Sequence, residues 1–188
     1  MPPRQLRLEM LLATELLDKL VGDWDLTGRM GEIPLQQAVV GKRTLGELFV
    51  ELYFKSTLPA PVGQKPYEAV YYIGYNDEND LFVMHLLDTF GVGLSCIVGI
   101  GKQEGNTIPF VFDYEDGPFT NRFIWDETAD AWRFEQTYLK KRPGAYLCHK
   151  RDGSEQVGLA WRKRFSTPKN YPIGAIFSRK WSQSRQTA

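Results

Sequence analysis

A single histidine lies within an apolar stretch of this sequence. His85 alternates with Leu81, Val83 and Leu87, so in an extended strand all four side chains share one face. A polar ring on an apolar interior face needs a hydrogen-bonding partner. Asp88 falls on the opposite face of a regular strand, so a His85–Asp88 dyad would require a β-bulge. Two interpretations stay open: an imidazole that faces a cavity, and a wall histidine satisfied by its neighbours.

Arg122 is the second polar side chain in a strand-like stretch. Facing inward, its guanidinium would demand an acceptor, and Tyr138 with Gln136 on the next strand would complete a clamp for a carboxylate. An internal arginine and tyrosine play that role in fatty-acid-binding barrels. Facing outward, Arg122 would pair with Glu135 or Glu51 on the outer wall. The sequence leaves both orientations open.

The familiar signatures of catalysis are missing from the sequence. It has no G-x-S-x-G motif and no evident carboxylate pair, and its two cysteines, Cys96 and Cys148, lack metal-binding spacing. The glycines at 91, 93, 99 and 101 lack the lysine and the strand-to-helix context of a phosphate loop. We predict no cofactor and no metal, and the sequence assigns no reaction.

Composition limits the partners. Lys and Arg number 23 and so do Asp and Glu, which leaves no bulk field to recruit nucleic acid or an anionic membrane. No apolar run reaches the roughly 20 residues of a membrane helix, and acidic residues interrupt the first twenty positions, so no signal peptide is expected. We expect a cytoplasmic protein with no nucleic-acid or membrane partner.

The elements that must position these side chains are one helix and a series of strands. Over residues 5–20 apolar residues recur at helical spacing, and from Val21 onward short β-rich runs alternate with turn residues. We predict a helix in 1–20, a barrel domain over 21–167, and a partly disordered extension over 168–188. The expected strands lie near 24–30, 36–45, 47–56, 67–75, 81–88, 93–101, 108–115, 119–126, 131–140 and 156–165.

A consecutive antiparallel series of about ten strands predicts an all-β barrel, because closure removes both exposed edges and creates an interior face. The 131–140 strand carries aromatic residues on one side and charged residues on the other, so its aromatic side should face inward. For the 67–75 strand the alternation does not decide which face is inside. The residues that we expect to line a cavity are Tyr71, Tyr75, His85, Arg122, Trp132, Phe134 and Tyr138.

The tripeptide Gly22-Asp23-Trp24 resembles the G-x-W that opens the first strand of lipocalins and other calycins. Trp161-Arg162-Lys163-Arg164 offers the basic partner that packs across this tryptophan in those proteins. A closer resemblance, over roughly residues 15–165, is to uncharacterised bacterial calycin-like domains, carried further by Phe49 to Tyr53, Ile73-Gly74-Tyr75-Asn76, and Met84 to Asp88. The resemblance implies a calycin-like barrel with a cavity, and it implies no activity.

A more distant likeness is to nitrobindin-type haem barrels, in which a histidine binds the iron. The residues after Trp24 depart from the glycine spacing of that group, and only His85 and His149 are available as ligands. We therefore do not predict haem.

Three functions fit these expectations. The first is binding of a small hydrophobic or amphipathic molecule in the barrel cavity. The second is an enzyme of the isomerase or lyase type acting on such a ligand, which predicts convergent polar groups in the cavity. The third is an interaction protein with a filled barrel, whose exposed aromatic residues would form a homodimer surface.

Overall fold

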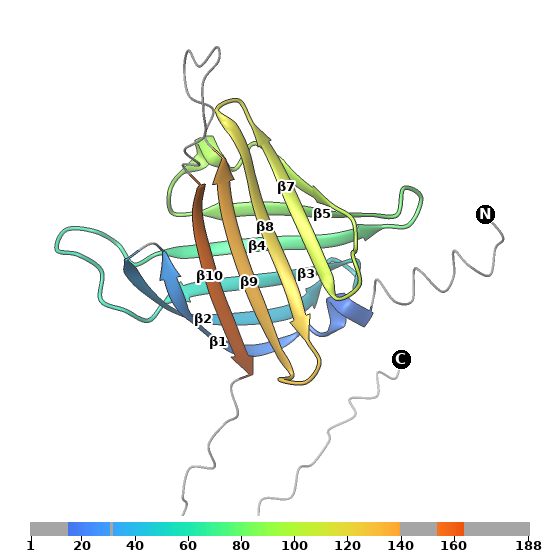
Figure 1. Ribbon diagram of the computed structural model, residues 1–188, viewed down its shortest axis with the longest axis horizontal. Helices are drawn as coiled ribbons and strands as arrows, with labels where there is room; N and C mark the ends of the chain where they lie inside the picture. The colour runs from blue at the N-terminus through green and yellow to red at the C-terminus, as the bar shows by residue number, and fades with distance from the viewer. Residues whose placement is uncertain (1–14, 31, 140–153, 164–188) are drawn as a thin grey trace, which may run out of the picture.

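The computed structural model describes residues 15–30, 32–139 and 154–163. It shows a closed antiparallel barrel of ten strands (Figure 1), as the sequence predicts. The strands are β1 (Gly22–Met30), β2 (Ile33–Thr44), β3 (Phe49–Ser56), β4 (Glu68–Asn76), β5 (Leu81–Asp88), β6 (Val98–Gly101), β7 (Thr107–Tyr114), β8 (Gly117–Asp126), β9 (Ala131–Leu139) and β10 (Ser154–Lys163). The predicted extension over 168–188 lies outside the described residues.

Every strand pairs with its neighbours in the chain, and β1 closes the ring by pairing with β10. The shortest strand is β6, which begins later than the expected 93–101 because Val92–Leu94 form a 3-10 turn. Only two residue pairs join β6 to β7, Ile100 with Val111 and Gly101 with Phe110. All other neighbouring strands are joined by longer ladders, so the pairing of β6 with β7 is the shortest in the barrel.

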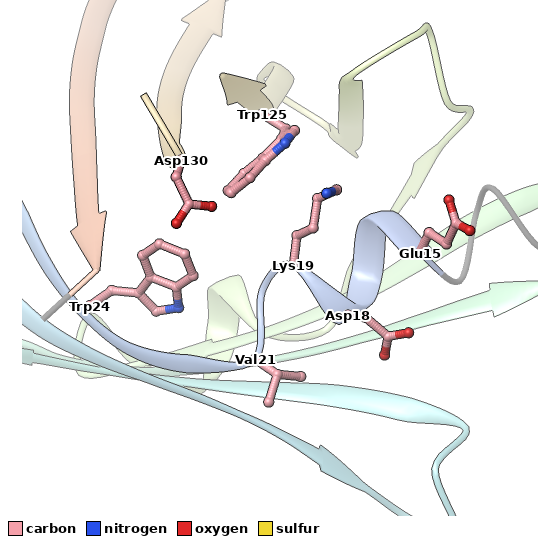
Figure 2. Close-up of a pocket in the computed structure, with 7 residues that line it drawn as sticks. All are labelled: Glu15, Asp18, Lys19, Val21, Trp24, Trp125 and Asp130. Atoms are coloured by element: carbon pink, nitrogen blue, oxygen red, sulfur yellow. The ribbon is translucent and has the colours of Figure 1, made fainter. Parts of the chain in front are cut away.

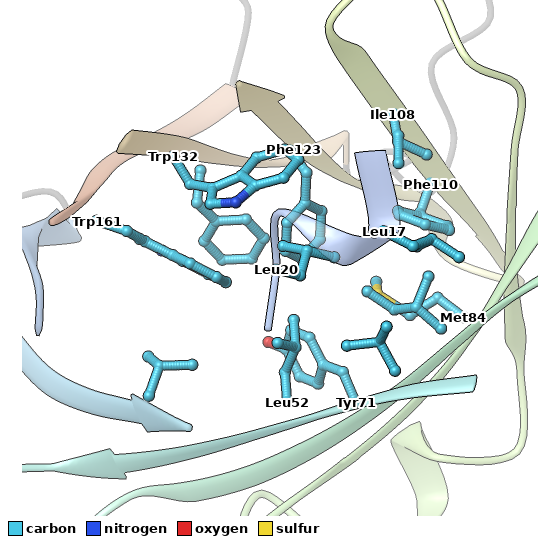
Figure 3. Close-up of a cluster of buried hydrophobic side chains, with 14 of the residues drawn as sticks. Leu17, Leu20, Leu52, Tyr71, Met84, Ile108, Phe110, Phe123, Trp132 and Trp161 are labelled. Carbon is cyan, nitrogen blue, oxygen red and sulfur yellow. The ribbon is translucent and has the colours of Figure 1, made fainter. Parts of the chain in front are cut away.

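Alternation along the strands builds the interior. In β9 the aromatic side faces inward, as predicted, with Trp132 and Phe134 nearly inaccessible to solvent. In β4 the side that carries Tyr71 and Ile73 is also the inner one. Figure 3 shows Tyr71 and Trp132 in the barrel interior together with Leu52, Phe110 and Phe123 from other strands. Burying side chains of this size stabilises the fold by roughly 1.5–3 kcal/mol each.

The end of the N-terminal helix plugs one end of the barrel. Residues 15–18 are helical, and the leucines at positions 16, 17 and 20 are buried among the strands. The indole N–H groups of Trp24 and Trp132 donate hydrogen bonds to the carbonyl oxygens of Leu20 and Lys19, each over 3.0 Å. The earlier part of the predicted helix lies outside the described residues. We call the end of the barrel that holds these buried leucines the plugged end, and the opposite end of the barrel the open end.

A glycine lets the plug approach the wall. A Cβ atom added at Gly41 in β2 would lie 2.0 Å from the carbonyl oxygen of Leu20 and 3.0 Å from the Leu52 side chain. A side chain at position 41 would not fit in that space. Glycine at this position therefore allows the end of the helix to pack directly against β2. The plug is therefore held by apolar burial, two indole hydrogen bonds and one close backbone contact.

Candidate binding site at the open end of the barrel

A cavity of about 430 Å³ lies inside the barrel at the open end. Its rim includes Phe90, which is 69% exposed, whereas its depth is lined by buried side chains such as Leu86. The lining is mostly aromatic and aliphatic, with a few polar groups. It comprises Met30, Leu35, Gln37, Phe54, Ser56, Tyr67, Tyr71, Leu86, Asp88, Phe90, Tyr114, Asp116, Phe119, Phe134, Gln136 and Tyr138.

Three aromatic rings form the floor of the cavity. Phe54 from β3 lies 4.5 Å from Tyr71 of β4 and 6.5 Å from Phe134 of β9, measured between ring centroids. Trp161 lies beneath them, 5.5 Å from Phe54 and 5.8 Å from Phe134. All four are at most 2% exposed. Below this floor the barrel is filled as far as the plug, so a ligand can enter only the upper part.

One carboxylate faces the cavity from the end of β5. The Oδ1 atom of Asp88 accepts a hydrogen bond from the backbone N–H of Phe90 over 2.9 Å. The Tyr67 hydroxyl donates to Oδ2 over 3.5 Å, which is a long contact. Burial raises the pKa of the Asp88 carboxyl above its ordinary value, although these hydrogen bonds act in the opposite direction. Asp88 is therefore a partly desolvated acceptor at the cavity wall.

Neutral phenols and an amide continue from Asp88 toward the floor. Tyr71 and Gln136 line the cavity together with Tyr67. Burial is the main cause that raises the pKa of both tyrosines, so both stay protonated throughout the neutral range. We call Asp88, Tyr67, Tyr71 and Gln136 the Asp88 cluster. It offers a ligand hydrogen-bonding groups along one side of an otherwise apolar cavity.

The rim carries a second acidic group. Asp116 lies in the turn between β7 and β8, and its hydrogen bond with the Tyr138 hydroxyl is the largest cause that raises the pKa of that phenol. Asp88 and Asp116 are the charged side chains among the described residues that line the cavity. The described lining therefore has a negative charge and no positive one.

A buried asparagine adjoins the cavity wall. Asn121 points inward from β8, is 0% exposed, and pairs in register with Gln136 of the lining. Neither its amide nitrogen nor its amide oxygen has a hydrogen-bond partner among the described residues. An unsatisfied buried amide costs roughly 1–3 kcal/mol. The wall beside Gln136 is therefore more polar than its aromatic neighbours suggest.

Of the residues expected to line the cavity, the structure brings together Tyr71, Phe134 and Tyr138. Tyr75 and Trp132 project inward but lie near the plugged end, outside the cavity. The Tyr75 hydroxyl donates a hydrogen bond to Asp80 over 2.9 Å in the turn between β4 and β5. Trp132 packs against the plug through its bond to Lys19. Tyr75 and Trp132 therefore face the interior as expected, but the expectation that they line the cavity is wrong.

The expectation that His85 faces the cavity is wrong. In β5 the inner positions belong to Phe82, Met84 and Leu86, so His85 lies exposed on the outer face. No bulge interrupts the pairing of β5 with β4, so Asp88 falls on the opposite, inner face of the regular strand. A His85–Asp88 dyad does not form.

Arg122 also points away from the cavity. Its guanidinium lies 3.4 Å from the Glu135 carboxylate on the outer wall, with 45% of the side chain exposed. Phe123 and Asn121 take the neighbouring inner positions of β8. An unpaired guanidinium would be costly to bury, whereas the outer wall offers both solvent and a carboxylate. The carboxylate clamp is therefore wrong, and the alternative pairing with Glu135 is confirmed.

Asp88 and Tyr67 are cavity residues that the sequence interpretation did not select. Asp88 shares the inner side of β5 with Leu86, and Tyr67 precedes β4 on the same side as Tyr71. Alternation along the chain groups Tyr67 with Tyr71, whereas the side on which Asp88 lies follows only from the pairing of β5 with β4. β5 is apolar on both faces, so its own sequence does not indicate which side is the inner one.

A second hollow, of about 360 Å³, lies outside the plug (Figure 2). Lys19 reaches from the end of the helix over the ring of Trp125, with its ammonium 4.9 Å from the ring centroid. Glu15, Asp18 and Asp130 make the hollow mostly polar, and Trp24 contributes an almost buried ring. This hollow lacks the extended aromatic lining of the cavity, so the open end is the stronger candidate site.

Among the described residues, no three His, Cys, Asp or Glu side chains are grouped closely enough to hold a metal ion. Of the two histidines that the sequence offers as possible haem ligands, His85 lies on the outer face and His149 falls outside the described residues. Within the described ranges, no helix is long and apolar enough to cross a membrane.

Comparison of the sequence with protein-family models finds no match, and comparison with curated proteins finds none either. The all-β barrel itself is consistent with a calycin-like architecture. The structure thus shows the architecture that the resemblance implies, and membership of a calycin family stays a proposal.

Proposed function

We propose that this protein binds a small amphipathic molecule in the cavity at the open end of the barrel. The observation that carries the proposal is the contrast between the two halves of the interior. The half next to the plug is filled by side chains, whereas the other half holds a cavity of about 430 Å³. That volume falls within the range of small-molecule sites, which are mostly apolar with a few polar groups.

The lining suits an amphipathic ligand rather than a purely apolar one. The rings of Phe54, Tyr71 and Phe134 would hold the apolar body at the floor. Asp88 and Tyr67 stand nearer the rim, where the polar end of the ligand would lie. A filled barrel acting only through its surface predicts no such cavity, so the cavity favours binding over a purely structural interaction protein.

A cavity-blocking variant with a matched control tests the proposal. Leu86 is buried in the lining, and its neighbour Leu87 is 44% exposed on the outer face. We expect Leu86→Trp to bind the uncharged fluorescent probe N-phenyl-1-naphthylamine at least tenfold more weakly than the wild type. We expect Leu87→Trp to bind it as the wild type does. Native mass spectrometry and organic extraction of the freshly purified proteins would identify any molecule that only the wild type and Leu87→Trp retain.

If Leu86→Trp does not fold, as judged by far-ultraviolet circular dichroism, Ser56→Phe blocks the same cavity from its rim. Equal probe binding by the wild type and a folded blocking variant would contradict the proposal. Absence of both probe binding and any retained molecule in the wild type would contradict it as well.

One observation favours a second candidate, an enzyme that moves a proton on the same ligand. Asp88 combines a raised pKa with a position on the cavity wall, as catalytic acids and bases often do. This candidate predicts that the protein catalyses exchange of a C–H hydrogen of the extracted ligand with deuterated water. Asp88→Asn should abolish that exchange.

A further inference from the structure

The charges that line the cavity limit what kind of head group it can accept. Asp88 and Asp116 are acidic, and the described lining contains no lysine, arginine or histidine. Arg122, for which the sequence left a carboxylate clamp and an outward orientation both open, is turned outward and paired with Glu135. A ligand carboxylate would therefore lose its hydration beside other carboxylates with no cation to replace it, which is unfavourable in a partly desolvated site.

The Asp88 carboxylate has unused capacity to accept hydrogen bonds. A carboxylate offers about four lone-pair positions. The Asp88 carboxylate accepts hydrogen bonds from the backbone N–H of Phe90 at 2.9 Å and from the hydroxyl of Tyr67 at 3.5 Å, and the backbone N–H of Gly91 also stabilises its charged form. A ligand donor at the rim would find an acceptor that is already fixed in place by the turn at Phe90.

The aromatic lining favours a positive charge at the same place. Tyr67 and Phe90 contact each other with their ring centroids 5.3 Å apart beside Asp88, and Tyr114 and Tyr138 also line the cavity. Aromatic faces attract cations, and the attraction increases when the cation is desolvated. The negative charge of Asp88 contributes to raising the pKa of both Tyr67 and Tyr114, so its field extends across the rim.

We propose that the cavity selects apolar molecules with a protonated amine head, held by the Asp88 carboxylate, over molecules of the same shape with a carboxylate head. This inference rests on the proposed function, because it concerns the ligand class of the same cavity. An ammonium group supplies three donors and no acceptor, and so matches a wall whose charged groups are all acceptors. The aromatic floor takes the apolar body, and the acidic rim takes the charge.

Three probes with one apolar body and different heads test the selection: 4-phenylbutylamine, 4-phenylbutan-1-ol and 4-phenylbutanoate. Their dissociation constants are measured by isothermal titration calorimetry at pH 7. For the wild type we expect the amine to bind at least tenfold more tightly than the carboxylate, which corresponds to about 1.4 kcal/mol, with the alcohol in between. Displacement of N-phenyl-1-naphthylamine would show that the probes occupy the cavity.

Two variants assign the preference to a residue. Asp88→Asn keeps an oxygen for the Phe90 N–H and removes the charge, so the amine should lose most of its advantage over the alcohol. Asp113→Asn removes the same charge from the exposed outer face of β7 and should leave that advantage unchanged. If Asp88→Asn does not fold, the ranking of the three heads on the wild type still decides the proposal.

The outcomes separate this inference from the function on which it rests. Equal or tighter binding of the carboxylate, or an amine advantage that survives in folded Asp88→Asn, would overturn the selection for amines and leave the binding function standing. If none of the three probes binds and N-phenyl-1-naphthylamine does not bind either, the proposed function fails, and the inference fails with it.

Discussion

The plug at Gly41 offers the sharpest test of how the barrel is closed. In Gly41→Ala the new Cβ would lie 2.0 Å from the Leu20 carbonyl oxygen, whereas ordinary contacts of a Cβ begin at about 3.4 Å. The end of the helix must therefore move outward by more than about 1 Å. That movement disturbs the hydrogen bond from the Trp24 indole to the same oxygen and shifts the buried side chain of Leu20.

The expected cost follows from those two contacts. Forcing extra volume into a packed interior costs typically 1–3 kcal/mol, and loss of a buried hydrogen bond adds about 1 kcal/mol. We therefore expect Gly41→Ala to lower the free energy of unfolding by about 2–4 kcal/mol. For a domain of this size each kcal/mol lowers Tm by roughly 2–4 °C, so the change is readily measured.

Urea denaturation followed by tryptophan fluorescence and by far-ultraviolet circular dichroism provides the assay. Gly93→Ala is the control, because an added Cβ there meets no atom within 4 Å, and it should stay within about 0.5 kcal/mol of the wild type. If Gly41→Ala is as stable as this control, the close contact between the helix and β2 is not what holds the plug.

The remaining predictions concern the cavity wall and the outer face. Burial raises the pKa of Asp88, so ionisation of this carboxyl opposes folding, and Asp88→Asn should raise the free energy of unfolding at pH 7. This gain in stability should vanish at a pH below 3.8, the ordinary pKa of the carboxyl, because Asp88 is then protonated in both the folded and the unfolded state. Urea denaturation at pH 7 and at a pH below 3.8 measures the difference. A variant less stable than the wild type at pH 7 would contradict this. Arg122→Ala and His85→Ala should each leave the binding of N-phenyl-1-naphthylamine within twofold of the wild type, since both side chains lie on the outer face; a tenfold loss in a fluorescence titration would place either one in the site.

Much of the barrel was readable from local sequence. The turn after Tyr75 has an aspartate at position 80 with positive φ, a backbone state that Asp and Asn tolerate better than most residues. Signals of this kind divide the strands correctly, and the division into consecutive hairpins leads to a closed barrel. In β9 charged residues alternate with aromatic ones, so its inner face followed directly.

The orientation of β5 was not readable in the same way. Val83 and Leu87 are as apolar as Met84 and Leu86, yet the first pair faces outward and the second inward. His85 was therefore assigned to the wrong face. Its pairing with β4 fixes the face, and such pairing is a property of the assembled sheet rather than of one strand.

The sequence also does not indicate which part of the barrel interior is left open as a cavity. Trp132 and Tyr138 belong to the same inner face of β9, but only Tyr138 borders open space. The difference arises because the end of the helix enters the barrel beside Trp132, and its leucines take up the volume there. A pattern of apolar residues predicts an interior surface, whereas the space left within it depends on what arrives from distant parts of the chain.

The closure of the barrel by β1 and β10 has a consequence for how the protein is made. All the other pairings are local hairpins, which form early, whereas Leu26 meets Trp161 only after nearly the whole barrel has been synthesised. Until then the first nine strands present two unpaired edges, and Trp24 lacks the ring of Trp161 that lies 6.5 Å away in the finished fold. Open edges and exposed aromatic rings promote aggregation of nascent chains. The pairing that leaves the finished barrel without edges thus makes its precursor, during synthesis, the form most in need of protection.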